Sequence, residues 1–204
     1  HNVHGILIQL PLPKHLNTQN ILNKVSSHKD VDGFSVINSG NLTLNIPSTY
    51  PCTPVGCIEL LDRYNISLEG KNAVIIGASN IVGLPLSLML LHREATPTIC
   101  HIKTKNLIEH TKRADIIFAC CGCMEMIKSD WVSDGVIIID IGIHKKDKKC
   151  VGDVDYNDIM NSNKCAAITP VPGGIGPMTV ATLMKNTLQC ALALQCEKEK
   201  ECCL

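Results

Sequence analysis

The chain has 204 residues, of which 45% are hydrophobic and 19% are charged, a balance typical of a globular protein with a real core. Its 19 lysines and arginines equal its 19 aspartates and glutamates, so no overall field favours nucleic acid or an anionic membrane. Aromatic residues make up only 3%, which argues against base stacking, and no apolar run reaches the roughly 18 residues of a membrane span.

Twelve cysteines are spread along the chain rather than framed at disulfide spacings, which fits reduced intracellular thiols. Cys120 and Cys123 form one C-x-x-C pair. This pair closes a predicted strand instead of opening a helix, so a structural role is favoured over a redox role. No second pair stands at metal-ligand spacing, and we expect no metal. The first residues show no signal-peptide pattern, and a cytoplasmic or mitochondrial location is expected.

Apolar runs of strand length alternate with helix-length segments, the pattern of a parallel α/β sheet. In the first part of the chain, GILIQL at 5–10 predicts a strand and 17–26 a short amphipathic helix with its N-cap at Asn17 or Thr18. The polar stretch 28–42 is typical of a loop. Residues 53–64 predict a helix entered through Thr53 and Pro54.

A more regular α/β pattern begins at residue 72. It predicts strands at 72–77, 96–101, 115–122 and 135–143, and helices at 81–92 and 105–113. The charged residues 144–149 predict a solvated turn, and the segment from 166 onward a proline-glycine loop followed by a long helix. We therefore expect a cofactor-binding domain at 53–167, while 1–52 and 168–204 form a second, discontinuous domain.

The glycine loop Gly77-Ala78-Ser79-Asn80-Ile81-Val82-Gly83 lies between a predicted strand and a predicted helix. This is the position where a pyrophosphate meets a helix N-terminus in dinucleotide-binding folds. A β–α turn also needs glycine for plain geometry. The strand before the loop and the helix after it favour nucleotide binding.

Three further features are candidates for ligand contact. Asp32 in KDVDG can offer a bidentate acceptor to a pair of N–H donors, although an Asx-turn explains it equally well. Gln9 lies near a predicted strand end, where open α/β sheets place ligand groups, although many such glutamines are only structural. Residues 170–177 hold three prolines and three glycines, and this composition favours ligand contact over a mere turn.

Taken in order, HGILIQLPLP, KDVDGFSVINSGNL, PCTPVG, GASNIVGLP, KSDWVSDGVIIIDIGI, GDVDY and ITPVPGGIGPMTVATLMKNT closely resemble the bifunctional methylenetetrahydrofolate dehydrogenase/methenyltetrahydrofolate cyclohydrolase family. The resemblance runs from His4 to about Ala191. It implies a Rossmann-type cofactor domain inserted in a folate-binding catalytic domain, NADP or NAD as cofactor, and a homodimer through the cofactor domain. The implied reactions are oxidation of methylenetetrahydrofolate to methenyltetrahydrofolate and hydrolysis to formyltetrahydrofolate.

The resemblance also implies roles for individual residues. Gln9 and Asp32 correspond to catalytic and folate-binding positions, and Pro172 and Gly173 to backbone that contacts the folate. The implied cofactor contacts are Gly77, Ala78, Ser79, Ile102, Gly122 and Ile143.

Three departures from the family pattern bear on activity. In the family, the catalytic lysine lies in a Tyr-x-x-x-Lys helix upstream of the motif around Gln9. These residues contain no equivalent of it, so we expect little or no cyclohydrolase activity. Ala78 replaces an arginine and Ile102 a serine, and both of the replaced residues serve the phosphate of NADP. No acid stands where NAD enzymes bind the ribose, so we expect weakened NADP binding rather than a switch to NAD. The alternative is a degenerate member that acts as a binding or assembly partner.

Overall fold

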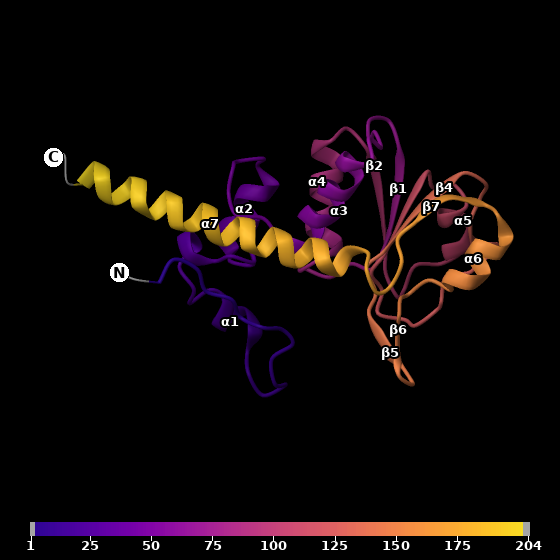
Figure 1. Cartoon of the computed structure of the whole chain (residues 1–204), viewed down its shortest axis with the longest axis horizontal. Helices are drawn as coiled ribbons and strands as arrows, with labels where there is room; N and C mark the ends of the chain where they lie inside the picture. Colours follow the sequence, from indigo (N-terminus) through magenta and orange to yellow (C-terminus); the bar gives the residue numbers. More distant parts are fainter. Residues whose placement is uncertain (1–2, 202–204) are drawn as a thin grey trace. The chain divides into compact units, whose positions relative to one another are not determined.

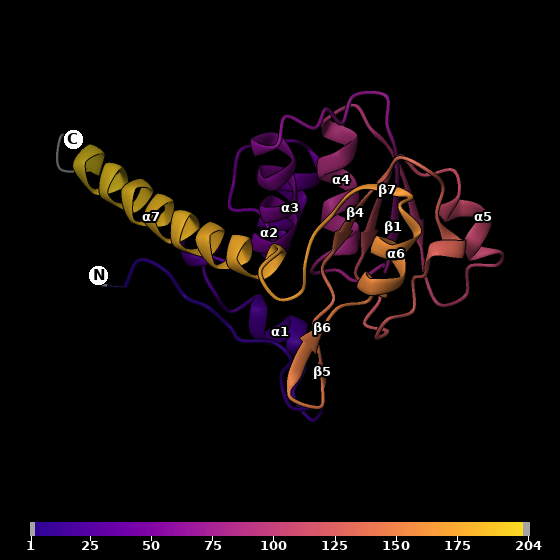
Figure 2. The ribbon, with the colours of Figure 1, turned by 45° about the vertical axis from the view of Figure 1, so that its right-hand side comes forward.

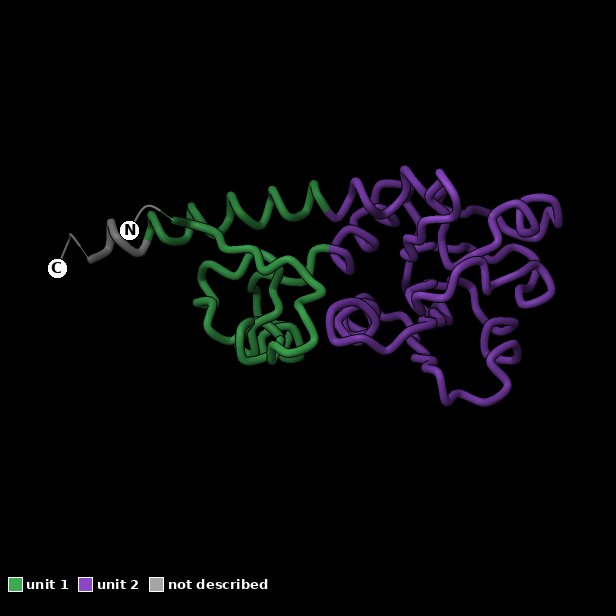
Figure 3. The backbone as a smooth tube through the Cα atoms, turned by 90° about the horizontal axis from the view of Figure 1, so that it is seen from below, with its two compact units in different colours: residues 1–52, 180–204 green, residues 53–179 purple. Residues whose placement is uncertain are grey.

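The computed structural model describes residues 3–201, which divide into two compact units (Figure 3). Unit 1 comprises His1–Cys52 and Val180–Leu204, and unit 2 comprises Thr53–Thr179. The long helix α7 (Ile175–Glu201) begins in unit 2 and continues in unit 1. Within the described residues, every helix is too short or too polar to span a bilayer.

Unit 2 is built on a five-stranded sheet in which every strand pairing is parallel (Figures 1 and 2). The strands are β1 (Asn72–Ile76), β2 (Thr96–Cys100), β3 (Ile116–Ala119), β4 (Val136–Asp140) and β7 (Cys165–Ile168), in the order β2-β1-β3-β4-β7. The four strands expected from apolar runs are confirmed. The strand order reverses between β1 and β3, and open α/β sheets bind ligands at the carboxyl side of such a reversal.

Helices cover both faces of this sheet, as continuous isoleucine and valine runs require (Figures 1 and 2). On one face, α3 (Cys52–Arg63) and α4 (Gly83–His92) pack Leu61, Leu86 and Leu90 against Ile75 and Phe118. On the other face lie α5 (Leu107–Thr111) and α6 (Tyr156–Ser162), and Ile159 of α6 joins the cluster that contains Ile117 and Ile138. The core therefore holds the strand ends at fixed positions.

Two expectations for unit 2 were wrong or incomplete. Residues 144–149 are not merely a solvated turn but belong to the hairpin of β5 (His144–Lys146) and β6 (Lys149–Val151), which turns at Asp147.

 Asp147 has a φ of 54, in the left-handed region, which aspartate tolerates because its short side chain can form local hydrogen bonds. The charged composition of this segment did not predict the two short strands. Strand β7 and helix α6 were not predicted. Helix α6 is marked only by its N-cap, the side chain of Asp155, which accepts a hydrogen bond from the Asp158 N–H at 3.2 Å.

Unit 1 contains α1 (Thr18–Leu22), the 3-10 turn η1 (Ser27–Lys29) and α2 (Val36–Thr43). Asn17 caps α1 as expected, by accepting from the Asn20 N–H. The stretch predicted as a loop at 28–42 contains most of α2, whose N-cap is Ser35. Serine at this position signals a helix start, and the polar composition concealed it.

The strand expected at 5–10 was also wrong, since that segment makes only an isolated parallel bridge between Ile6 and Asp30. The Ile6 N–H donates to the Lys29 carbonyl at 2.7 Å. The opposing chain then turns away, because the Asp30 carboxylate accepts from the N–H groups of Gly33 and Ser35 at 3.0 and 2.7 Å. No ladder can extend past such a turn.

Asn186 of α7 ties three segments of unit 1 together. Its buried side-chain amide donates to the carbonyls of Val31 at 2.9 Å and Tyr50 at 3.1 Å, and it lies 3.5 Å from the sulfur of Cys52. A leucine of similar size would leave both carbonyls without this donor, and a buried polar group without a partner costs about 1–3 kcal/mol.

We therefore expect Asn186→Leu to lower the free energy of unfolding by roughly 2–4 kcal/mol. Urea denaturation followed by circular dichroism measures the change. Gln189→Leu, at an exposed position of the same helix, is the matched control and should change stability by less than about 0.5 kcal/mol. Equal stability of the two variants would contradict the structural role of Asn186.

Candidate functional site at the carboxyl edge of the sheet

The residues expected to contact the cofactor lie directly after the carboxyl ends of the parallel strands in unit 2. Gly77 follows β1, Ile102 follows β2, Gly122 follows β3, and Ile143 follows β4. A parallel sheet brings these ends to one edge, so four separate loops meet there. Pro172 and Gly173 follow the fifth strand, β7, in the same unit.

The glycines of the loop after β1 have a structural reason. Gly77 has φ 129, and a Cβ there would collide with the carbonyl oxygen of Cys120 on β3's extension. A Cβ on Gly83 would collide with the carbonyl oxygen of Gly77. Plain backbone packing therefore requires both glycines, and glycine spacing alone does not identify a ligand.

The backbone donors of the same loop point to an anion. The Ser79 hydroxyl accepts from the Val82 N–H at 3.2 Å, and the Leu84 N–H donates to the Ser79 carbonyl at 3.0 Å. Among the described residues, no acceptor takes the N–H groups of Ala78, Ser79, Asn80 or Ile81. Successive free N–H groups at the start of a helix suit a phosphate, so these residues fit the pyrophosphate of a dinucleotide.

The loop after β2 is closed by its own side chains. The His101 N–H donates to the Thr104 hydroxyl at 2.9 Å, and the Lys103 N–H donates to Nδ1 of His101 at 3.0 Å. The imidazole thus caps its own turn, and the Ile102 side chain is 96% exposed. Lys103 and Lys105 are exposed beside it, so the loop offers positive charge and no carboxylate.

Two buried aspartates hold the loops after β3 and β4, and sequence reasoning missed both. Oδ2 of Asp153 accepts from the N–H groups of Cys121 at 2.7 Å and Gly122 at 3.0 Å, and Oδ1 lies 2.7 Å from Nε2 of His144. Asp140 accepts from the N–H groups of Gly142, Asp153 and Val154, each at 3.0 Å. Burial raises the pKa of Asp140 to about 6, although the hydrogen bonds from these three donors act in the opposite direction and lower it.

The only available signal for these aspartates was their position. Asp140 ends an apolar strand, and Asp153 stands in the GDVD segment after a charged loop. An acid inside an otherwise apolar run must find donors when it is buried.

The thiols near this edge do not fit a redox site. All cysteines that the structure describes are free. Burial, and secondarily the negative charge of Asp153, raises the pKa of Cys120 to about 12. A reactive pair needs a lowered thiol pKa, so the structural interpretation of Cys120 is favoured.

In unit 1, Asp30 and Asp32 differ in role. Asp30 is buried and makes the Asx-type bonds to its own loop, an interpretation that the sequence offered for Asp32. Asp32 is half-buried, and burial raises its pKa, while a hydrogen bond with Cys52 lowers it and the charge of Asp30 raises it further. Gln9 is exposed, and its side chain donates to the carbonyl of Leu10 at 3.1 Å.

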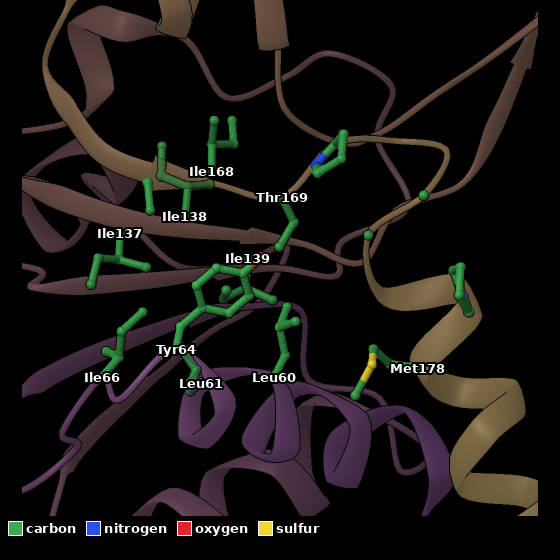
Figure 4. A pocket seen from close by; sticks show the side chains of 15 residues that line it. Leu60, Leu61, Tyr64, Ile66, Ile137, Ile138, Ile139, Ile168, Thr169 and Met178 are labelled. Carbon is green, nitrogen blue, oxygen red and sulfur yellow. The ribbon is translucent and has the colours of Figure 1, made fainter.

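A separate cavity of about 370 Å³ lies beside the edge strand β7 (Figure 4). Leu60 and Leu61 of α3, with Tyr64 directly after that helix, line it opposite Ile137–Ile139 of β4, and Met178 of α7 lies at one end (Figure 4). Gly173 also lines it, but no residue of the loops after β1, β2 or β3 does. Its lining is mostly apolar, with side-chain hydroxyl groups from Tyr64 and Thr169, so it can take an apolar group, and among the described residues no carboxylate, imidazole or amine lines it.

Comparisons with known proteins agree with this geometry. The NAD(P)-binding domain of the tetrahydrofolate dehydrogenase/cyclohydrolase family matches residues 51–195, and the catalytic domain of the same family matches residues 1–32. The bifunctional protein FolD of Campylobacter jejuni (strain RM1221) is 54% identical over 192 residues, covering 93% of this chain and 67% of the relative. FolD of Nitratiruptor sp. is 53% identical over 190 residues, with the same coverage.

Solved structures are similar over the same range. The C. jejuni FolD methylenetetrahydrofolate dehydrogenase/cyclohydrolase superposes with a TM-score of 0.89 at 53% identity, covering 93% of this chain and 67% of that one. Trypanosoma brucei FolD, complexed with NADP cofactor and inhibitor, gives 0.85 at 33% identity, covering 92% and 66%. The resemblance noted in the sequence is confirmed, and the chain belongs to the tetrahydrofolate dehydrogenase/cyclohydrolase family.

Proposed function

We propose that this protein acts in one-carbon folate metabolism and oxidises methylenetetrahydrofolate to methenyltetrahydrofolate with NADP. Hydrolysis of this product to formyltetrahydrofolate is the family's second reaction, and we expect these residues to support little of it, because none of them corresponds to the family's catalytic lysine. The observation that carries the proposal is the free N–H groups of 78–81 at the reversal point of a parallel sheet. The relatives support it, because they are bifunctional proteins and the T. brucei relative was solved with NADP.

The chain's own residues contribute binding and orientation. The N–H groups of 78–81 would hold the pyrophosphate, and the loops around Gly122 and Ile143 would orient the nicotinamide end. The bound cofactor supplies the hydride acceptor. In unit 1, the Asp32 carboxylate would accept two N–H bonds from the pterin ring of the folate. We propose that Gln9, Pro172 and Gly173 are further contacts of the folate.

For the cofactor, we propose NADP bound with a weakened phosphate contact. A methyl group at Ala78 cannot form the charged fork of an arginine, and the exposed Ile102 offers no hydroxyl. Lys103 or Lys105 can supply a point charge to the phosphate. The homodimer through the cofactor domain stays a prediction.

The function is tested by assaying the full-length protein with methylenetetrahydrofolate and either NADP or NAD. We expect reduced dinucleotide to form with both cofactors and faster with NADP at low concentration. Separation of the folate products by chromatography then shows how much methenyltetrahydrofolate proceeds to formyltetrahydrofolate. Absence of turnover with both cofactors would overturn the proposal.

Asp32→Asn should raise the KM for the folate by about 10- to 100-fold, because a hydrogen bond to a charged group contributes about 1.5–3 kcal/mol. The KM for NADP should stay within about twofold. Asp134→Asn, an exposed aspartate in unit 2, is the matched control and should change neither constant.

The same carboxylate predicts a pH dependence. Burial raises the pKa of Asp32, so its neutral form persists to a higher pH than in a free aspartate. Because the ionised form accepts the two bonds, the folate KM should rise on acidification, starting above the ordinary aspartate range. In Asp32→Asn this rise should disappear; a parallel rise in the variant would assign it to another group.

Ala78→Arg should lower the KM for NADP by about tenfold and leave the KM for NAD unchanged, since the added guanidinium meets a phosphate that only NADP carries. Steady-state kinetics with both cofactors provide the measurement. Ala78→Met, which adds a similar length without charge, is the control. An equal gain for NAD, or the same gain in Ala78→Met, would refute a phosphate contact.

A further inference from the structure

The side chain of Asp153 is fully buried and joins two loops of the candidate cofactor site. On one side its Oδ2 accepts from the N–H groups of Cys121 and Gly122, at 2.7 and 3.0 Å, and from the Cys121 thiol at 3.3 Å. On the other side its Oδ1 is paired with Nε2 of His144 at 2.7 Å. The loop after β3 and the start of the hairpin after β4 are therefore bound to one carboxylate.

Asp153 is itself held in place by Asp140. The Asp140 carboxylate accepts from the N–H groups of Asp153 and Val154, both at 3.0 Å. A Cβ on Gly142 would collide with the Asp153 carboxyl group, and a Cβ on Gly152 with that of Asp140. The two carboxyl groups therefore pack directly against glycine backbone, and close packing of this kind transmits a change at one partner of Asp153 to the others.

His144 is the partner of Asp153 that can be altered without touching the backbone. Its side chain is 19% exposed, it begins β5, and it adjoins Ile143, a proposed cofactor contact. A carboxylate accepts and does not donate, so we assign the proton of this bond to Nε2 of the imidazole. Among the described residues, no other group bonds Oδ1 of Asp153. Loss of the imidazole would leave a buried carboxylate oxygen without a donor.

We propose that His144 is a positioning residue for the dinucleotide, acting through Asp153 on the backbone of Cys121–Gly122 and directly on Ile143. This inference rests on the proposed function, because Gly122 and Ile143 are cofactor contacts only if a dinucleotide binds here. Its imidazole holds the two loops in one relative position. Partners that orient metal ligands change metal affinity or activity by about 10- to 100-fold when removed, and we expect an effect at the lower end of this range here.

The test compares His144→Ala, which removes the donor, with His144→Gln, which keeps an N–H donor of similar reach. Calorimetric titration of the full-length protein with NADP, without folate, gives the Kd. We expect the Kd to rise about tenfold in His144→Ala and to return to within about threefold of wild type in His144→Gln. The KM for the folate should stay within twofold in both variants. Hydrogen exchange should show faster exchange of the Cys121 and Gly122 amides in His144→Ala only.

Matched variants separate this role from a general loss of structure. His92→Ala, at the end of α4, should leave the Kd and the exchange of both amides unchanged. If His144→Ala does not fold, His144→Leu, which keeps the volume without a donor, should show the same weakened binding.

Three results would count against the inference. Wild-type protein that binds neither NADP nor NAD would overturn the proposed function together with the inference. Wild-type binding with an unchanged Kd in His144→Ala would overturn the inference alone. A lower kcat with unchanged Kd and unchanged amide exchange would place the effect of His144 on the reaction step and would also overturn the inference.

Discussion

The candidate site depends on the hydrogen bonding of two buried carboxylates at the carboxyl edge of the sheet. Loops that follow parallel strands carry N–H groups that find no acceptor on a neighbouring strand. Each such group that is buried without a hydrogen-bond partner lowers the stability of the fold by about 1–3 kcal/mol. Asp140 and Asp153 accept from five such N–H groups and from the imidazole of His144. They convert separate loops into one continuous edge on which a ligand can be oriented.

The same constraint explains why glycine recurs at this edge. Gly142 and Gly152 leave space for the carboxyl groups, and Gly77 and Gly83 leave space for carbonyl oxygens. These glycines serve the protein's own packing, so we propose that the ligand is recognised by the backbone N–H groups that remain. Backbone recognition of a pyrophosphate is common to NAD and NADP. In the proposed site, the choice between them would then fall to the side chains of Ala78, Ile102 and Lys103.

The sequence predicted the centre of the fold well and its margins poorly. Strands β1, β3 and β4 are isoleucine- and valine-rich runs that are largely buried, so local pattern and tertiary packing agree. Strand β7 reads CAAI and stands at the sheet edge, where it needs less apolar surface, and it was missed. The hairpin of β5 and β6 is held by backbone pairing and by the left-handed conformation of Asp147, and neither feature produces an apolar pattern in the sequence. At 5–10 the apolar pattern was present, but the opposing chain turned away at Asp30.

By itself, the sequence determined the α/β class, the glycine loop between a strand and a helix, and membership of the family, because each of these depends on residues close together in the chain. Only the tertiary structure decided which aspartate is structural and which is available, since Asp30 and Asp32 have the same local pattern but different hydrogen-bond donors. It also revealed the carboxylates of Asp140 and Asp153, whose donors come from segments up to 32 residues away. Burial and hydrogen bonding across such separations are properties of the folded chain, and no local pattern encodes them.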